Sequence, residues 1–286
     1  MTLGKGRAAA VTDADMAALA DSFGCHPADL EAIAEVESSG FGWFDDGRIK
    51  ILFEKHWMYK HVSGAERTKA INQGLARKSW VSPKNGGYAD QKSPNDRYRL
   101  LSLAIAINRE AALKSISAGR FQIMGFNHGI CGFASALEMW DAFLDSEANQ
   151  LRAFGNFLKS KGLVAALRRR DFGAVEKGYN GGGLGGAYAK KMKAASDRLR
   201  ADKWKNYRLG SMKPEPAVMP APEPAQAAPA PAPVPEAIQP VSRPVAQPAP
   251  VTEAPEPNPI FSAILAFIAR LFANGRPNWT PDDDKT

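Results

Sequence analysis

Cysteine is nearly absent from this chain of 286 residues, in which only Cys25 and Cys131 occur. Two cysteines exclude a disulfide-rich scaffold and a metal site built from several thiolates. The first ten residues carry Lys5 and Arg7 but lack the apolar stretch that a secretory signal requires. We therefore expect synthesis in the cytoplasm, with both thiols free, and a different exit route for any work beyond the membrane.

Apolar runs long enough for an ordinary transmembrane helix are also missing. The apolar run at 259–273 has 15 residues and contains Arg270. As a helix it would be about 22 Å long, whereas the hydrocarbon core of a bilayer is about 30 Å thick. We predict an apolar or amphipathic helix over 259–275 that contacts a membrane surface. Docking on the rest of the chain, or pairing with another chain, is the alternative.

Bulky apolar residues are scarce between positions 212 and 258. This stretch of 47 residues contains 15 Pro and 11 Ala. Such a composition buries too little apolar surface to offset the entropy of ordering, so it predicts a semi-extended linker. Residues 1–211 are then long enough for one domain with a core. Residues 276–286 form an acidic tail that we expect to be disordered.

Positive charge is concentrated in the predicted domain. The whole chain has a net charge of +7, and residues 212–286 hold 5 basic and 8 acidic side chains. The remaining 32 basic and 22 acidic residues give the domain a charge of +10. This excess favours a polyanionic partner, either nucleic acid or an anionic polymer of the cell envelope.

Helix signals dominate the domain. Thr12 is a good N-cap for a helix that ends at Gly24, and His26-Pro27 opens a second helix that stops at 38–40. Later apolar spacing predicts further helices near 98–114, 135–145, 146–161, 163–168, 171–178 and 186–203.

A small β element interrupts this pattern. Alternating residues after the turn at 45–47 predict a hairpin within 41–60, and 75–97 reads as a long loop. The fold class is therefore mostly α (α+β), with a small β-hairpin.

Glu37 is the first candidate for chemistry. It lies at the end of the second predicted helix on the same face as Leu30 and Ile33, so it is expected to point inward. Aromatic residues at 41–44 follow directly and would enclose it. A carboxyl group in an apolar setting has a raised pKa and can act as a general acid. Taken alone, this position favours a solvated helix-end glutamate, as we expect for Glu35.

Three segments in a fixed order strengthen the case for Glu37. They are residues 36–41 with 46–56, residues 119–127, and residues 179–181, the last reading Tyr-Asn-Gly. Together they resemble the N-acetylmuramidase family of phage endolysins and related bacterial proteins, within the lysozyme-like superfamily. The likeness covers about residues 12–204 and excludes the linker and the C-terminal apolar run.

The resemblance implies a lysozyme-like domain that hydrolyses peptidoglycan. Glu37 matches the catalytic glutamate, the general acid that cleaves the β-1,4 bond between N-acetylmuramic acid and N-acetylglucosamine. Ser117, Gln122, Tyr179 and Asn180 match positions that line the sugar cleft. Glycan strands are then the partner, and no metal or cofactor is implied.

Two residues are candidates for a second catalytic carboxylate. Glu54 lies on the predicted strand, and Asp46 lies at the hairpin turn. We favour Glu54, because aspartate in Asp-Asp-Gly is typical of turns. Glu54 would alternatively be structural, paired with Arg48, Lys55 or Arg120, or bonded to the Glu37 helix.

Other functions remain open from sequence alone. A lytic transglycosylase would use the same glutamate, and a wall-binding protein would not use it catalytically. A nucleic-acid binder is favoured by charge alone, and no recognised binding motif supports it. His56 and His61 are five residues apart, a spacing that does not place both on one helix face for a metal. We expect a monomer of phage, prophage or bacterial origin.

Overall fold

The computed structural model describes residues 2–180 and 186–210 of the chain. The predicted linker, the C-terminal apolar run and the acidic tail lie outside these residues. The part described is mostly helical, with one small antiparallel sheet. Its helices are α1 (Asp13–Phe23), α2 (Pro27–Ser38), α3 (Lys55–His61), α4 (Gly64–Asn72), α5 (Pro94–Ile105), α6 (Arg109–Lys114), α7 (Ala136–Asp145), α8 (Glu147–Ser160), α9 (Val164–Arg168), α10 (Phe172–Asn180) and α11 (Ala187–Ala201), with short 3-10 turns at Pro83–Asn85 and Gly125–Asn127.

Helix ends follow their local capping signals. The Thr12 side chain accepts a hydrogen bond from the Asp15 backbone N–H while Asp15 caps Thr12 in return, which satisfies two free N–H groups of α1. Gly24 ends α1 in the left-handed conformation, with φ of 63°. Pro27 begins α2 behind the His26 cap. The predicted bounds of the first two helices are confirmed.

The sheet differs from the predicted hairpin. Strand β1 (Ile51–Phe53) does not pair with 41–44 but with β2 (Ile116–Ala118), and β2 pairs with β3 (Ile123–Met124). The turn at 45–47 closes only a single antiparallel bridge, between Trp43 and Ile49. Residues 55–60, which the hairpin interpretation included, belong to α3 (Lys55–His61) instead. The strand itself was predicted, but its partner was not.

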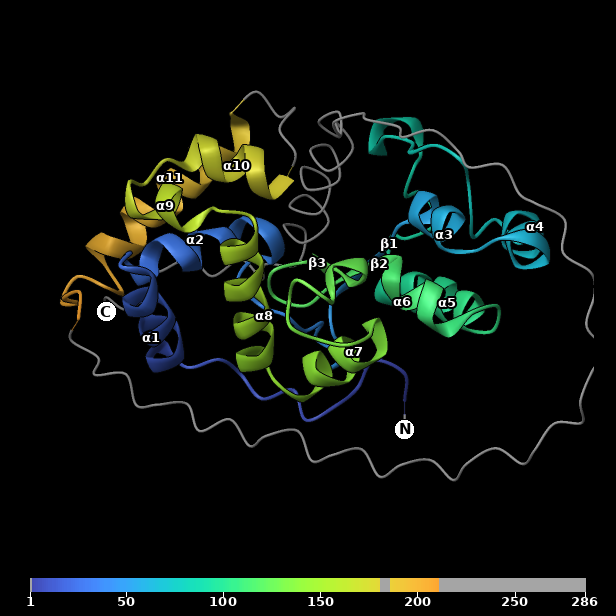
Figure 1. The fold of residues 1–286 in the computed structure, drawn as a ribbon, viewed down its shortest axis with the longest axis horizontal. Coiled ribbons are helices and arrows are strands. Elements are labelled where there is room, and N and C mark those ends of the chain that lie inside the picture. The colour runs from blue at the N-terminus through green and yellow to red at the C-terminus, as the bar shows by residue number, and fades with distance from the viewer. Residues whose placement is uncertain (1, 181–185, 211–286) are drawn as a thin grey trace, which may run out of the picture. The chain divides into compact units, whose positions relative to one another are not determined.

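Figure 1 shows two groups of helices with the sheet between them. Helices α1, α2 and α8 to α11 gather on one side, and α3 to α6 lie on the other. Helix α2 is buried along most of its length, with Leu30, Ile33 and Ala34 fully inaccessible. A helix enclosed in this way is held mainly by packing. Its C-terminal end is therefore a fixed platform for the residues that follow.

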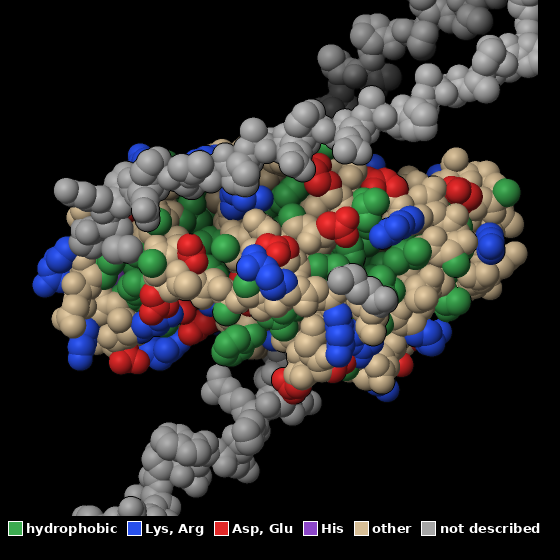
Figure 2. Space-filling view, turned by 90° about the horizontal axis from the view of Figure 1, so that it is seen from below, with side chains coloured by type: hydrophobic (Ala, Val, Ile, Leu, Met, Phe, Trp, Pro, Cys, Tyr) green, Lys and Arg blue, Asp and Glu red, His purple; other side chains and the backbone are tan. Residues whose placement is uncertain are grey.

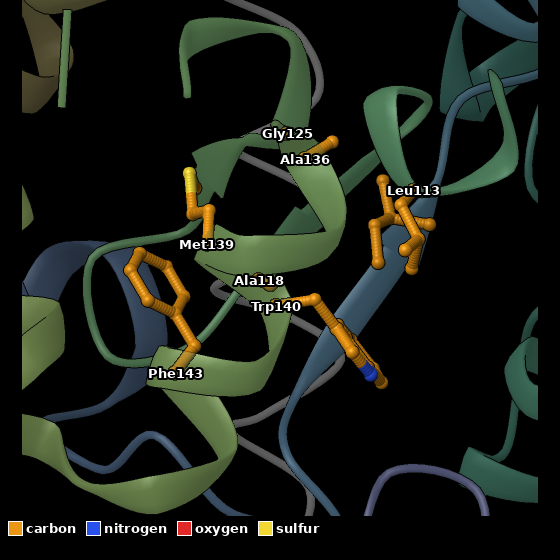
Figure 3. Close-up of a pocket in the computed structure, with 8 residues that line it drawn as sticks. Leu113, Ala118, Gly125, Ala136, Met139, Trp140 and Phe143 are labelled. Carbon is orange, nitrogen blue, oxygen red and sulfur yellow. The ribbon is translucent and has the colours of Figure 1, made fainter. Parts of the chain in front are cut away.

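A small apolar cavity of about 10 Å³ lies between α6, the sheet and α7. Figure 3 shows Leu113, Met139, Trp140 and Phe143 around it. This volume is about that of one water, and its apolar walls offer water no hydrogen bonds. It belongs to the core and not to a ligand site.

Charges of both signs share the surface. In the face shown in Figure 2, Lys and Arg side chains alternate with Asp and Glu around hydrophobic side chains. Among the residues described, no helix is both long enough and apolar enough to cross a membrane.

Candidate active site

Glu37 occupies the last turn of α2 and is only 1% exposed. The helix ends directly after it, because Ser39 adopts the left-handed conformation with φ of 59° and Gly40 follows with φ of 82°. The N–H of Gly40 bonds back to the Ala34 carbonyl and closes the helix. The prediction that Glu37 points inward, unlike a solvated helix-end glutamate, is confirmed.

The aromatic residues after Glu37 do not all enclose it as expected. Phe41 is 67% exposed, whereas Trp43 and Phe44 are half-buried and pack against the core. A turn follows directly at 45–47, so the chain leaves the helix end toward the surface. The burial of Glu37 therefore has other sources.

Ser38 ties the end of α2 to its neighbours. It is fully buried, and its hydroxyl donates to the Arg120 carbonyl at 2.6 Å. The Lys50 ammonium donates to the Ser38 carbonyl at 2.8 Å. Burial lowers the pKa of Lys50 to about 8. The position of Glu37 is thus set by the strand on one side and by residues 119–122 on the other.

Residues 119–122 form a tight loop between β2 and β3. Gln122 has φ of 47°, a conformation that is uncommon for residues other than glycine. Its amide donates to the Gly119 carbonyl at 2.8 Å and accepts from the Ser117 hydroxyl at 3.0 Å. Ser117 and Gln122 are both buried, and the structure brings these two predicted site residues together. Non-glycine residues held in this region cluster at functional sites.

Tyr179 joins the same site from α10. Its hydroxyl donates to the Phe121 carbonyl at 2.7 Å, next to Gln122. Burial raises the pKa of Tyr179, and the negative charge of Glu37 raises it further. Tyr179 therefore lies within electrostatic reach of Glu37 and stays protonated. Asn180 is the last residue of α10.

Tyr188 on α11 is a further candidate for the site, and it was not predicted from the sequence. It is 1% exposed, and its hydroxyl has no hydrogen-bond partner among the residues described. Burial is the main cause that raises the pKa of Tyr188, and the negative charges of Glu37 and Glu176 raise it further. A buried hydroxyl near Glu37 is a candidate hydrogen-bond donor to that carboxylate. The only sequence signal was an aromatic residue in an otherwise basic helix.

Glu54 lies in a separate buried network. Both of its oxygens accept from the Tyr88 hydroxyl, at 3.0 and 2.9 Å, and Trp80 donates to Tyr88 at 3.0 Å. His56 lies 3.3 Å from Glu54. Burial raises the pKa of Glu54, and His56 and Tyr88 oppose that shift. The structural pairing expected with Arg48, Lys55 or Arg120 is replaced by Tyr88 and His56.

Asp46 hydrogen-bonds within its own turn, as expected for an aspartate in Asp-Asp-Gly. Its carboxylate accepts from the Arg48 backbone N–H at 3.0 Å and from the Arg48 guanidinium at 2.5 and 2.8 Å. These hydrogen bonds lower the pKa of Asp46. The side chain is 40% exposed and already paired, so Glu54 is the better second candidate.

Two buried polar residues of α8 hold the loops that frame Glu37. Glu147 accepts from the Gly42 backbone N–H at 2.7 Å and from Arg120 Nη1 at 3.2 Å. Gln150 accepts from the Arg120 backbone N–H at 2.7 Å. One helix therefore fixes both 39–43 and 119–122. The sequence contained these residues but gave no sign of this role.

Residues 2–180 and 186–210 contain no cluster of three or more His, Cys, Asp or Glu side chains arranged to hold a metal ion. Cys25 and Cys131 are buried free thiols, as expected, and burial raises the pKa of each to about 12. What the site does offer is a buried carboxyl beside tyrosine hydroxyls, an arrangement suited to proton transfer.

Comparisons with known proteins agree with this geometry. A sequence model of the N-acetylmuramidase family matches residues 26–200. The crystal structure of Burkholderia AP3 phage endolysin is similar in fold, with a TM-score of 0.59 and 34% sequence identity, and the match covers 70% of this chain and 75% of that one. No curated protein matches the chain. The family match contains every candidate site residue.

Proposed function

Because the chain belongs to the N-acetylmuramidase family, we propose that it is a peptidoglycan hydrolase. The bond cut is the β-1,4 link between N-acetylmuramic acid and N-acetylglucosamine. The observation that carries this proposal is Glu37, a carboxyl that is 1% exposed at a rigid helix end. No metal or organic cofactor takes part in the proposed reaction.

Glu37 is the proposed general acid. Burial disfavours a charged carboxylate and so favours the protonated form that an acid catalyst needs. Glu37 transfers its proton to the glycosidic oxygen, and the bond to the departing sugar breaks as an oxocarbenium-like centre develops. Tyr188 remains protonated and is proposed to orient the resulting carboxylate, while the Tyr179 hydroxyl, also protonated, donates to the Phe121 carbonyl.

Glu54 is the proposed second carboxylate, which meets the oxocarbenium-like carbon or activates a water from the other face. Its 1% exposure and its hydrogen bonds from Tyr88 also suit a carboxyl that positions β1 and the loop carrying Tyr88. A catalytic role and a positioning role of Glu54 are distinguished by kcat: the substitution Glu54→Gln should lower kcat more if Glu54 is catalytic than if it only positions β1 and the Tyr88 loop.

Four further residues are proposed to bind sugar. Ser117, Gln122, Tyr179 and Asn180 supply hydroxyl and amide groups, which pair well with N-acetyl groups. Ser117 and Gln122 already hydrogen-bond to each other, so the Gln122 amide is held in one orientation. A fixed amide loses less entropy when it binds substrate.

A lytic transglycosylase is the second candidate. It uses one carboxyl as acid and then as base, with a sugar hydroxyl in place of water. The separate network of Glu54 favours this candidate, because it leaves Glu37 as the one carboxyl assigned here to the cluster around Gln122 and Tyr179. A wall-binding protein without catalysis is the third possibility.

Digestion of purified sacculi tests these proposals. Wild type should release soluble muropeptides with reducing ends, whereas 1,6-anhydro ends would identify a transglycosylase. Glu37→Gln should lose at least a thousandfold in rate at unchanged thermal stability. Glu138→Gln, the same change at an exposed position of α7, is the matched control and should keep full activity. Undiminished lysis by Glu37→Gln would refute the assignment.

The setting of the reaction is also proposed. The enzyme is made in the cytoplasm as a monomer and acts on the wall after release. The positive charge of residues 1–211 holds it near anionic envelope polymers. The apolar run at 259–273 is proposed to contact membrane.

A further inference from the structure

The positive charge of the domain is concentrated in one part of the fold. Residues 150–180 and 186–210 hold 15 basic and 4 acidic side chains, a net charge of +11. Residues 1–149 hold 17 basic and 18 acidic side chains, a net charge of −1. The positive segments form most of α8 together with α9, α10 and α11, which gather on one side of the sheet (Figure 1). We call residues 150–180 and 186–210 the basic lobe.

The acidic residues of the basic lobe neutralise little of this charge. Glu176 is 4% exposed, and its carboxylate accepts from two backbone N–H groups at the start of α11. Asp171 accepts from a backbone N–H of α10 at 2.9 Å. Asp197 is paired with both Lys193 and Arg170. The lobe's own carboxylates therefore form ion pairs with only these two cations among the residues described.

Carboxylates of α2 neutralise three more cations of the basic lobe. The pairs are Arg198 with Glu35, Arg200 with Asp29, and Lys203 with Glu31. The other ten basic residues of the lobe are exposed and form no ion pair with any residue that the structure describes. They are Arg152, Lys159, Lys161, Arg168, Arg169, Lys177, Lys190, Lys191, Lys205 and Arg208. This surface is therefore strongly cationic after its internal pairs are taken into account.

Several of these cations meet at the C-terminal end of α1. The Arg168 guanidinium donates to the Phe23 carbonyl, and the Lys159 ammonium lies 5.4 Å from the centroid of the Phe23 ring. Lys161 and Arg169 follow Lys159 and Arg168 within two residues of the chain. The ends of α8 and α9 thus bring their positive charges to the same place.

The described part of the chain ends beside this cluster. The backbone N–H of Gly210 donates to Asp21 at 2.7 Å, and the Tyr207 hydroxyl donates to the same carboxylate. Asp21 lies in the last turn of α1, as Phe23 does. The 48 residues at 211–258 then lead to the apolar run at 259–273. A Pro-rich segment of that length spans at most about 150 Å, so one surface is within reach of both the basic lobe and the apolar run.

We propose that the basic lobe docks on an anionic phospholipid membrane. Lys and Arg side chains close to such a surface bind its phosphate groups, and their contributions accumulate. Electrostatic attraction to anionic lipids also strengthens the attachment of a short interfacial helix, as expected for 259–273. Two linked contacts hold the chain more firmly than either alone, because the first raises the effective concentration of the second.

Nucleic acid presents phosphate groups as well, but it offers no apolar phase for the run at 259–273. A membrane matches both the basic lobe and that run. The inference extends the membrane contact proposed for 259–273 to a surface of the folded domain, and it does not depend on hydrolysis.

Binding of the full-length protein to vesicles tests this surface. The vesicles contain phosphatidylcholine alone or phosphatidylcholine mixed with anionic phosphatidylglycerol, and binding is measured by co-sedimentation at low salt. A triple variant removes three exposed lysines of the basic lobe, namely Lys159→Gln, Lys161→Gln and Lys190→Gln. The matched control removes three exposed lysines of residues 1–149, namely Lys69→Gln, Lys78→Gln and Lys84→Gln. Both variants lose three positive charges, so they differ only in where the charge is lost.

We expect the lobe variant to bind mixed vesicles at least tenfold more weakly than wild type, and the control variant less than twofold more weakly. Equal losses in both variants would overturn the proposal, as would wild-type protein that binds both kinds of vesicle equally well. A second titration uses short double-stranded DNA. If the lobe variant loses affinity for DNA and keeps its affinity for mixed vesicles, nucleic acid is the partner and the membrane proposal is wrong.

Hydrolysis and thermal stability separate this inference from the proposed function. Both triple variants should melt at the wild-type temperature and should cut soluble glycan strands at the wild-type rate, because none of the six lysines belongs to the candidate active site. Wild-type protein that binds mixed vesicles but cuts no glycan would overturn the proposed function and leave the docking surface intact. Full hydrolysis with no preference for anionic vesicles would overturn the docking surface alone.

Discussion

Two glutamates of α2 show how much the setting of a residue decides. Glu35 and Glu37 are two positions apart, yet Glu35 is 31% exposed and paired with Arg198, while Glu37 is 1% exposed. A helix turns by about 200° over two residues, so the two side chains leave on nearly opposite faces. Only the Glu37 carboxyl is removed from water, a setting that disfavours the charged form of a carboxyl group. The apolar spacing of Leu30, Ile33 and Glu37 was sufficient to predict which of the two side chains points inward.

Glu54 should make stability fall as pH rises. Its pKa in the folded protein is raised above the ordinary 4.5, so the native state binds this proton more tightly than the unfolded chain does. The resulting stabilisation is present below about pH 4.5 and is lost as pH rises through the folded pKa. In the Glu54→Gln variant the side chain at position 54 is uncharged at every pH, and its amide oxygen can still accept a hydrogen bond from the Tyr88 hydroxyl. Chemical denaturation from pH 4 to 8 should therefore show a shallower decline in the variant, and parallel curves would contradict this.

The same variant decides the catalytic role of Glu54. If Glu54 is the second catalytic carboxylate, the substitution Glu54→Gln should lower kcat at least a hundredfold on sacculi. Tyr88→Phe removes the hydrogen bond and keeps the carboxyl, so it serves as the control and should cost about tenfold or less. An equal loss in both variants would assign Glu54 to positioning.

His61 should have the opposite pH dependence. Burial, with Lys114 and Lys60 nearby, lowers its pKa from 6.5 to about 4. The unfolded chain then takes up a proton that the folded protein refuses, so stability falls as pH drops from about 6.5 toward 4. We expect a loss on the order of 2 kcal/mol after allowance for partial exposure. NMR titration of the His61 ring should give a midpoint near 4, and a midpoint near 6.5 would contradict this.

At the scale of elements, local signals predicted helices well and strand pairing poorly. Thr12, Gly24 and Pro27 each act through neighbours within a few residues, so their effect is visible in sequence. The partner of β1 is more than sixty residues away, and β2 has only three residues, too few for a pattern. Helix α3 was missed because its residues were assigned to the hairpin.

Ser117, Gln122 and Tyr179 were proposed as site residues through resemblance, and their roles stay predictions. The structure pairs Ser117 with Gln122 and bonds Tyr179 to Phe121, beside Gln122. Tyr188, Glu147 and Gln150 were not assigned roles. Their roles depend on how α8 and α11 pack against residues far away in the chain, which no local pattern reports.

Two glycines with nearly equal backbone angles test the role of α8. Gly119 and Gly47 have φ of 77° and 78°, so alanine is strained at both. A Cβ at Gly119 would lie 2.5 Å from Gln150 Oε1, whereas one at Gly47 would meet nothing within 4 Å. Gly47→Ala should cost about 1–2 kcal/mol in unfolding free energy.

Gly119→Ala should cost more and also reduce activity. Overpacking adds about 1–3 kcal/mol to the backbone strain, because Gln150 must leave the Arg120 N–H. Displacing that loop moves Gln122, so sacculus digestion should slow at least tenfold at a temperature where the variant is folded. Gly47→Ala is the control for strain alone. Equal losses of stability in both variants would show that Gln150 does not hold the loop.

At the scale of the whole molecule, charge is distributed unevenly along the chain. The excess of ten positive charges lies in residues 1–211, while residues 212–286 are negative overall. Attraction to an anionic envelope is long-range and is screened over about 10 Å at 0.1 M salt. Wall association should therefore weaken as the salt concentration rises.

The C-terminal apolar run should attach the protein to anionic membranes. Residues 259–273 combine large apolar side chains with Arg270, a composition typical of helices that lie in the interface. Deleting 259–273 should reduce co-sedimentation with vesicles of mixed neutral and anionic phospholipid at least fivefold, while hydrolysis of soluble glycan strands stays unchanged. Deleting 276–286 instead removes the acidic end and keeps the apolar run, so partitioning should persist or increase. If the deletion of 259–273 partitions like wild type, the positive domain alone accounts for membrane contact, and raising the salt to 0.5 M should then abolish it in both proteins.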